Sequence, residues 1–263
     1  MPRRSSASVA GAHTVDRACT LLKEIARHGA SGARLLDLTK NSGLSRPTVH
    51  RILHSLASPA FIRQDPATRR YQLGVGLFTL GLAAPNPVEG LPELRSLLDA
   101  LATQTGDTAY LWTRQGDEVL CLARVEGPSP IRTFLYDPGA VRPIGATLAG
   151  TTMLAALDDA EVEAVLARTA AAMARYRGAT PDYVRRQIAA VRRSGFCHSE
   201  NLLIEGATGL SAPVASRDGP PYLAVSLSAI CARVPKSRVK PLSEVLLRTC
   251  QKMAQALARG AAA

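Results

Sequence analysis

The 263-residue sequence predicts an α+β protein with a small N-terminal domain and a larger C-terminal one. Three observations support this prediction. Residues 14–74 show short amphipathic helical patterns followed by a hairpin pattern. A break rich in Ala and Pro follows at 83–87, after which helix and strand patterns alternate. Charge changes as well: residues 1–85 hold 12 Lys and Arg against 4 Asp and Glu, whereas the remainder holds 20 against 17.

Residues 36–56 predict two helices separated by a turn at Gly43. Ser45 is expected to cap the second helix, and Pro47 suits its first turn because that position needs no backbone N–H. One face of this helix is apolar, with Val49, Ile52, Leu53 and Leu56. The flanking faces carry Arg46, Thr48, His50, Arg51 and His54. This pattern is typical of a helix-turn-helix, although a helical hairpin with a solvated face would share it.

The flanking segments favour the first interpretation. A preceding helix is expected from Thr14 to His28, capped by Thr14 and ended by Gly29, with Val15, Ala18, Leu22 and Ile25 on its apolar face. After the second helix, residues 61–73 predict two strands joined by a turn at Asp65-Pro66. Phe61, Tyr71 and Leu73 are its expected inward anchors, and Arg63, Arg69 and Arg70 remain on the hairpin. Helix, helix-turn-helix and basic hairpin together predict a winged helix.

From Thr14 to Gly81 the chain resembles the DNA-binding half of IclR-type bacterial transcriptional regulators. The matching motifs are Asp16-Arg17-Ala18, Gly43-Leu44-Ser45, Thr48 to Leu53, and Tyr71-Gln72-Leu73-Gly74. Pro59-Ala60 stands where the family usually has a glycine before the first wing strand. The expected DNA-binding residues are Ser45, Arg46, Thr48, His50, Arg51, Arg63, Arg69 and Arg70. The basic N-terminal third agrees with a phosphate-binding surface.

The composition excludes several classes of protein. With 46% apolar residues the larger part can bury a substantial core, and no apolar run approaches the roughly 20 residues of a membrane span. The basic N-terminus lacks the apolar core of a secretory signal. The five cysteines are scattered without metal-ligand spacing, so no metal, cofactor or disulfide framework is expected. These features fit a cytoplasmic protein.

In the larger part, helices are expected at 91–105, 147–157, 159–168 and 180–194, with a final helix from about 237. Strands are expected at 108–113, 118–125, 131–135, 209–215 and 222–229. Val75 to Leu82 predicts a short linker helix that could pair with its copy in a dimer. The predicted domains are a disordered basic arm over 1–13, a winged helix-turn-helix over 14–74, a linker helix and hinge over 75–88, and an effector-binding domain over 89–263.

This half resembles the GAF-like effector-binding domain of the same family. The carrying stretches are Pro143 to Leu154, Arg193 to Phe196, Glu200, Gly206, Ala212-Pro213-Val214 and Ala224 to Ser228. The resemblance implies that a small organic molecule, often a carboxylate, binds between sheet and helices. It points to Ser226, Ser228 and the backbone at Leu148-Ala149 as effector contacts. Three positions depart from the family pattern, Thr151, Ser199 and Gly209, and they favour a bulkier or less polar effector.

Other interpretations remain open for some of these residues. Ser226 and Ser228 share one face of their strand, where they could instead fill space beneath a helix. Arg132, on the expected strand 131–135, could supply a countercharge to a carboxylate or could be an ordinary solvated arginine. The cluster Cys197-His198-Ser199-Glu200 could indicate an enzyme. However, neighbours in an extended segment point to opposite faces, and no nucleophile elbow or phosphate loop accompanies the cluster.

The sequence therefore predicts a ligand-responsive transcriptional regulator without catalytic residues. Its partners would be a double-stranded DNA operator, a small organic effector and a second copy of the chain, in a dimer or a tetramer. The alternative is an enzyme or metabolite sensor acting on a small organic acid without operator-specific DNA binding. A purely architectural DNA binder is disfavoured because two-thirds of the chain forms a separate domain with little excess of basic residues.

Overall fold

The computed structural model describes residues 13–83, 90–217 and 219–260, and the chain forms two compact units, 1–87 and 88–263. Most of the predicted basic arm and of the predicted hinge therefore lies outside the described residues.

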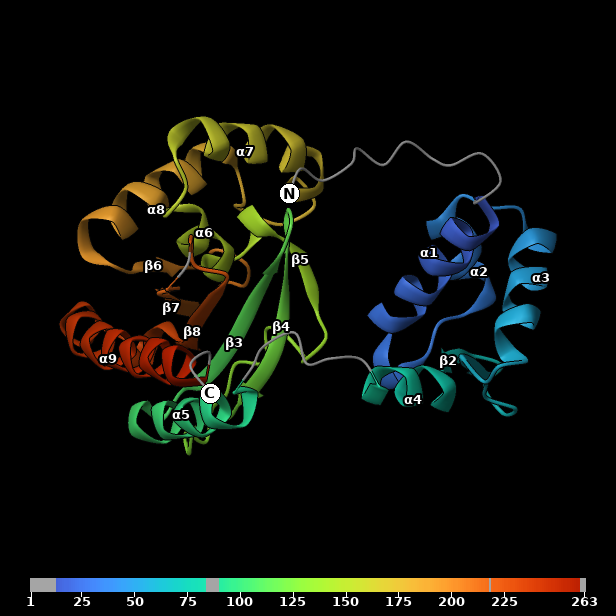
Figure 1. The fold of residues 1–263 in the computed structure, drawn as a ribbon, viewed down its shortest axis with the longest axis horizontal. Helices are drawn as coiled ribbons and strands as arrows, with labels where there is room; N and C mark the ends of the chain where they lie inside the picture. The colour runs from blue at the N-terminus through green and yellow to red at the C-terminus, as the bar shows by residue number, and fades with distance from the viewer. Residues whose placement is uncertain (1–12, 84–89, 218, 261–263) are drawn as a thin grey trace. The chain divides into compact units, whose positions relative to one another are not determined.

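The first unit is a winged helix-turn-helix (Figure 1). Its elements are α1 (His13–Arg27), α2 (Leu35–Ser42), α3 (Arg46–Ala57), β1 (Ile62–Gln64), β2 (Tyr71–Leu73) and α4 (Val75–Ala83). The turn between α2 and α3 depends on Gly43, whose φ of 68° is in the left-handed region that glycine adopts without strain. The order of elements agrees with the sequence prediction.

The core of this unit forms where α1 and α2 pack against α3. Val49, Ile52, Leu53 and Leu56 are buried as predicted, together with residues such as Leu21 of α1. The prediction for α1 was wrong at its N-terminus. The helix begins at His13, so Thr14 is inside it and not its cap, and Val15 is 64% exposed. The buried residues of α1 lie further along the helix, from Leu21 to Ile25.

The wing pairs Ile62 with Leu73 and Gln64 with Tyr71. Tyr71 is buried as predicted and Phe61 is half-buried, but Leu73 is 42% exposed, and Ile62 fills the core instead. Leu73 is the last residue of β2, where the chain turns into α4. The turn brings Gly74 against the preceding loop so closely that a Cβ there would lie 2.1 Å from the Ala60 carbonyl oxygen. Only glycine fits at this crossing.

The second unit is a three-layer α+β domain. In its described part, six strands form an antiparallel sheet in the order β5-β4-β3-β8-β7-β6. The strands are β3 (Thr108–Gln115), β4 (Glu118–Val125), β5 (Val141–Pro143), β6 (Cys197–Glu200), β7 (Ala207–Val214) and β8 (Leu223–Ile230). The helices are α5 (Leu91–Thr105), α6 (Leu148–Leu154), α7 (Asp159–Met173), α8 (Pro181–Ser194) and α9 (Lys236–Gly260). Helices α5 and α9 cover one face, and α6, α7 and α8 lie on the other (Figure 1).

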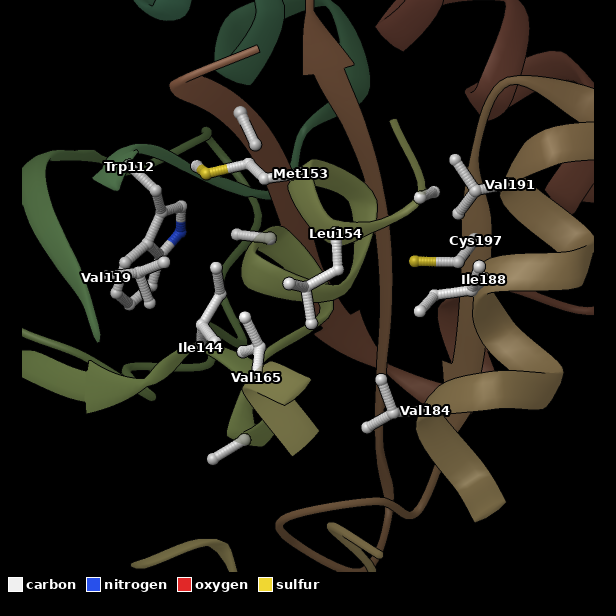
Figure 2. Close-up of a cluster of buried hydrophobic side chains, with 14 of the residues drawn as sticks. Trp112, Val119, Ile144, Met153, Leu154, Val165, Val184, Ile188, Val191 and Cys197 are labelled. Atoms are coloured by element: carbon white, nitrogen blue, oxygen red, sulfur yellow. The ribbon is translucent and has the colours of Figure 1, made fainter. Parts of the chain in front are cut away.

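Each face of the sheet has its own hydrophobic core. On one side, Leu98 of α5 and Leu246 of α9 pack against Leu111 and Val225 of the sheet. On the other side, side chains of α6 and α8 converge on one cluster, where Figure 2 shows Met153 and Leu154 with Val184, Ile188 and Val191. Because both faces are covered, β3 and β8 are buried along most of their length and neither face is exposed to solvent.

The prediction of a strand at 131–135 was wrong. This segment is irregular, and Ile131 and Phe134 are 58% and 54% exposed. The edge of β4 pairs instead with the short strand β5, through Leu120 and Val141. The Cys121 amide extends this pairing by donating to the Ala140 carbonyl at 2.9 Å. Residues 131–135 are not paired with any strand of the sheet.

Candidate nucleic-acid interface and ligand cavity

The recognition helix α3 begins directly after Ser45. The backbone of Ser45 is extended, as an N-cap residue requires, and Pro47 lies in the first turn. The Ser45 hydroxyl does not bond to a backbone N–H, however. It pairs with the Thr48 hydroxyl at 2.8 Å, so the predicted capping bond is absent and the two residues hold each other instead.

The face of α3 opposite the core is polar and accessible. Arg46, His50, Arg51 and His54 are exposed, and Thr48 is half-buried. Within the described residues, no ion pair involves Arg46 or Arg51. Both guanidinium groups are therefore available to a ligand. A packed helix with unpaired arginines at its N-terminal end has the features needed for binding base edges and phosphates.

The wing carries its arginines on a well-defined turn. One oxygen of the Asp65 carboxylate accepts from the Thr68 amide at 2.7 Å, from the Thr68 hydroxyl at 2.8 Å and from the Ala67 amide at 3.1 Å. These hydrogen bonds, led by that from the Thr68 amide, lower the pKa of Asp65. Arg63 and Arg69 are exposed. The three bonds therefore fix the turn that presents them.

Arg70 differs from the other wing arginines because its guanidinium bonds within the protein. It is half-buried and donates to the carbonyls of Gly32 and Ser31 at 3.1 and 3.3 Å. These bonds tie the wing to the loop between α1 and α2, so Arg70 helps to position the wing.

The second unit contains a small cavity of about 50 Å³ between the sheet and α6. Tyr110 and Trp112 of β3 and Ser226 and Ser228 of β8 line it from the sheet, next to Gly209 of β7. Helix α6 contributes Leu148 and Ala149, and two loops contribute Leu135, Tyr136 and Leu202 to Ile204. Four of the five residues predicted to contact an effector, Leu148, Ala149, Ser226 and Ser228, thus line one cavity.

Hydrogen bonds organise the polar groups of this cavity. The Trp112 indole N–H donates to the Ser226 hydroxyl oxygen at 3.0 Å, and the Ser228 and Thr133 hydroxyls lie 2.7 Å apart. The Tyr110 hydroxyl donates to the Thr133 carbonyl at 2.9 Å and accepts from the Leu135 amide at 3.1 Å. Burial raises the pKa of Tyr110 to about 12, so its phenol is neutral at physiological pH. These bonds hold the 133–135 segment against the sheet.

Arg132, the fifth predicted effector contact, does not line the cavity. Its guanidinium pairs with Glu126 at 2.8 Å and donates to the Ser129 carbonyl at 3.1 Å. Because 131–135 is irregular and not a strand, the backbone does not direct Arg132 along the sheet face. The geometry therefore favours the other interpretation of Arg132, an ordinary partly exposed arginine, here paired with Glu126.

Two family models match these units. The model for the IclR helix-turn-helix domain matches residues 14–66, and that for the bacterial transcriptional regulator IclR C-terminal domain matches residues 91–255. The second match alone covers more than half of the chain. This chain belongs to the IclR family.

Sequence relatives and solved structures of the IclR family match this chain over nearly its whole length. The transcriptional regulator XynR of Escherichia coli is 25% identical, over 93% of this chain and 96% of its own. The glycerol operon regulatory protein of Streptomyces coelicolor is 27% identical, over 90% and 92%. A crystal structure of an IclR regulator from Alicyclobacillus acidocaldarius, 24% identical, superposes with a TM-score of 0.76 over 93% of this chain and 98% of that one. The protein is a transcriptional regulator with a DNA-binding and an effector-binding domain, not an enzyme.

The cluster at 197–200 agrees with this assignment. Cys197 packs in the core beneath α6 and α8, where burial raises the pKa of its thiol to about 12. His198 points to the other face and shares a hydrogen bond with the Thr208 hydroxyl at 2.9 Å. Burial lowers the pKa of His198. The two side chains therefore diverge, as the strand geometry predicts, and form no nucleophile–base pair.

Sequence reasoning missed the aromatic and loop residues of the cavity, above all Tyr110, Trp112, Tyr136 and Leu202. The strand that carries Tyr110 and Trp112 is apolar on both faces, so its composition does not mark a cavity. The one usable signal was the indole N–H of Trp112, because a buried indole needs a hydrogen-bond acceptor.

Within the described parts of the chain, no group of three or more His, Cys, Asp and Glu side chains could hold a metal ion. No described helix has the length and apolar character needed to cross a membrane.

Proposed function

We propose that this regulator binds its operator by inserting α3 into the major groove, with Arg46, Thr48, His50 and Arg51 facing base edges and phosphates. Two observations support this proposal. The side chains of Arg46, His50 and Arg51 are exposed. Neither Arg46 nor Arg51 forms an ion pair with another described residue. Ser45, at the start of the helix, lies where a hydroxyl can reach a phosphate. Arg63 and Arg69 of the wing would bind the backbone, and Arg70 would hold the wing in place or reach a phosphate itself.

The regulator acts as a dimer, and α4 forms part of the dimer interface. This helix consists of apolar and small residues and has no buried residue in the first unit. Val75, Phe78 and Leu82 are 67%, 66% and 71% exposed, and their i, i+3, i+7 spacing puts them on one face. An apolar face of this kind is stable in water only when it is covered, and a second α4 is a symmetric cover. Two α3 helices would then read two half-sites, and a pair of dimers would form a tetramer.

The effector occupies the cavity beneath α6, where the backbone at Leu148 and Ala149 and the hydroxyls of Ser226 and Ser228 contact it. Its binding favours one arrangement of the two DNA-binding domains, and α4 transmits the change. The regulated genes form a metabolic operon, of the catabolic kind that the sequence resemblance implies; a glycerol operon regulatory protein is among the relatives. As a DNA-binding regulator, it would work in the cytoplasm.

The observation that carries the proposal is the exposed polar face of α3 next to an arginine-bearing wing. The test is binding of the purified chain to DNA from upstream of its own gene, against a scrambled fragment, across a salt series. Specific binding that Arg46→Ala or Arg51→Ala removes supports the proposal. Absence of binding to either fragment at low salt contradicts it, and equal, steeply salt-dependent binding contradicts operator recognition in that fragment.

A further inference from the structure

The floor of the cavity beneath α6 is shielded from solvent. Ser226 and Ser228 of the floor are 9% and 4% exposed, and Trp112 beside them is 0% exposed. The volume of about 50 Å³ has room for only a few water molecules, because each water needs about 10–15 Å³. An organic effector therefore cannot reach the floor unless part of the cavity wall moves.

Two parts of the wall are fixed by the fold. In the floor, β3 pairs with β8 from Thr108 to Thr113. Helix α6 is capped by Thr147, whose side chain accepts from the Gly150 amide at 2.9 Å. A Cβ on Gly150 would lie 1.9 Å from the Ile144 carbonyl oxygen, so the helix is packed without slack. A paired ladder and a close-packed helix open only with the fold itself. The movement therefore has to come from the two loops that complete the wall.

The loop that carries Leu202 is closed by hydrogen bonds at its base. The Asn201 side chain accepts from the Gly206 amide at 2.7 Å, and the Cys231 amide donates to the Gly206 carbonyl at 2.7 Å. Leu202 also packs closely on the turn before α8, since a Cβ on Gly178 would lie 2.8 Å from its Cδ1 atom. This loop is therefore held both to itself and to its neighbour.

The other loop, residues 131–135, is held to the sheet by side chains. Among the described residues, no backbone-to-backbone hydrogen bond involves this segment. Its bonds to the sheet are those of the Tyr110 hydroxyl to the Thr133 carbonyl and the Leu135 amide, and that between the Thr133 and Ser228 hydroxyls. Tyr110 alone therefore holds the segment at two backbone groups.

Little apolar packing resists opening of this segment. Ile131 and Phe134 are 58% and 54% exposed, whereas Leu135 turns inward and lines the cavity. The Arg124 guanidinium lies 4.7 Å from the centroid of the Phe134 ring, a contact that is weak at exposed sites. Segments with few buried apolar contacts and no backbone ladder are those that open at low free energy.

Both ends of the segment are anchored. Before it, the Ser129 amide donates to the Gly106 carbonyl at 3.2 Å. After it, the Tyr136 ring meets the Trp112 ring edge to face with centroids 4.7 Å apart, and Arg124 donates to the Tyr136 carbonyl at 3.2 Å. Opening is therefore confined to the residues between these anchors, which lie directly over the floor of the cavity.

We propose that residues 131–135 form a lid over the effector cavity and that the Tyr110 hydroxyl is its latch. When the two bonds to Tyr110 break, the lid swings outward, and the Ser228 hydroxyl exchanges its bond to Thr133 for one to the ligand. This inference rests on the proposed effector cavity and specifies how a ligand enters it. Tyr110 is then a positioning residue, because it acts through the lid.

The test measures access to Trp112, the only tryptophan of the chain and part of the cavity lining. The probe is acrylamide, a small uncharged quencher, and the measured quantity is its bimolecular quenching rate, which corrects for fluorescence lifetime. Tyr110→Phe removes the latch but keeps the ring, so we expect the rate to rise at least threefold. Tyr222→Phe, outside the cavity, is the matched control and should leave the rate unchanged.

An unchanged quenching rate in Tyr110→Phe overturns the proposal. Hydrogen exchange of the β3 and β8 amides is measured on the same samples and should match that of wild type. If quenching rises only together with loss of protection in these strands, the whole domain has loosened and Tyr110 is not a latch.

A reversible lock tests the lid itself. The Thr133 and Ser228 hydroxyl oxygens lie 2.7 Å apart, so Thr133→Cys combined with Ser228→Cys puts two thiols within reach of a disulfide. Cross-linking of this double variant should lower the quenching rate at least threefold, and reduction should restore it. Equal rates in the cross-linked and reduced forms would contradict entry beneath residues 131–135.

Operator binding by wild type and Tyr110→Phe is measured in parallel. The expected quenching results in a chain that binds no operator would contradict the proposed function but not the lid. Operator binding together with quenching rates that no variant changes would contradict only the lid.

Discussion

The side chain of Asn41 donates a hydrogen bond to the buried carboxylate of Glu24, and so joins the end of α2 to α1. Glu24 is 7% exposed and also accepts from Arg27 at 2.8 Å, with His28 Nε2 3.7 Å from its other oxygen. Asn41 lies two residues before Gly43, where the chain turns into the recognition helix. The Glu24–Asn41 bond therefore holds the C-terminal end of α2 against α1, next to the turn that leads into α3.

Replacing Asn41 with Leu should destabilise the DNA-binding domain by about 1.5–3 kcal/mol, because a buried carboxylate loses a charge-assisted hydrogen bond. Hydrogen exchange of the α1 and α2 amides would measure this loss. Lys40→Ala, one residue away and exposed, is the matched control and should change exchange little. Equal protection in Asn41→Leu and wild type would show that the bond contributes nothing to stability.

The same site predicts a pH dependence. Burial raises the pKa of Glu24, but the hydrogen bonds from Asn41 and Arg27 and the charges of Arg27 and His28 outweigh it, so the pKa lies below its ordinary value of 4.5. Because the folded-state pKa is depressed, its stabilisation is fully present above that ordinary value. It is lost as the pH falls through the folded-state pKa. Amide protection of α1 should therefore fall in acid, and Glu24→Gln should flatten the profile; a profile as steep in the variant would contradict this.

Arg51→Ala should weaken binding to the operator by about 1–3 kcal/mol if Arg51 contacts a base, and should relax specificity at one position. Fluorescence anisotropy with operator and scrambled DNA measures both effects. A contact to phosphate would instead weaken binding to both DNAs equally and reduce the salt dependence. Arg95→Ala, an exposed arginine of α5, serves as the charge-matched control. If operator affinity is unchanged in Arg51→Ala, α3 does not bind DNA in the proposed orientation.

If the chain dimerises through α4 as proposed, Phe78→Glu should convert the dimer to a monomer and weaken operator binding at least tenfold, because a charge on the apolar face of α4 cannot be buried in a symmetric interface. Sedimentation equilibrium reports the association state. Ala100→Glu introduces the same charge on α5 and should leave the dimer intact. A Phe78→Glu dimer as stable as wild type would place the interface elsewhere.

The DNA-binding domain could be predicted in detail because its signals are local. Gly43, Pro47 and the apolar spacing from Val49 to Leu56 each act within a turn or two of helix. The errors there were also local: Thr14 lies inside α1, and the Ser45 hydroxyl bonds to Thr48. The first error is a shift of one residue in the start of the helix, and the second arises because the Thr48 hydroxyl competes with the backbone for Ser45.

The effector-binding domain was less predictable because its cavity depends on long-range pairing. Ser226 and Ser228 could be identified from the resemblance and from their shared strand face. Trp112 could not, since its bond to Ser226 spans 114 residues. The strand expected at 131–135 also failed: this segment is held instead by hydrogen bonds of Thr133 and Leu135 to the side chains of Tyr110 and Ser228, which no local pattern marks.

The most direct test of the account is selection of binding sites by the full-length chain from a random double-stranded DNA library. Two symmetric α3 helices predict enrichment of an inverted repeat whose half-sites are separated by about 10 base pairs or a multiple of that spacing. The repeat should not be enriched by Arg46→Ala or Arg51→Ala. Recovery of no motif by the wild-type chain, or of the same motif by these variants, would contradict the claim that α3 reads an operator.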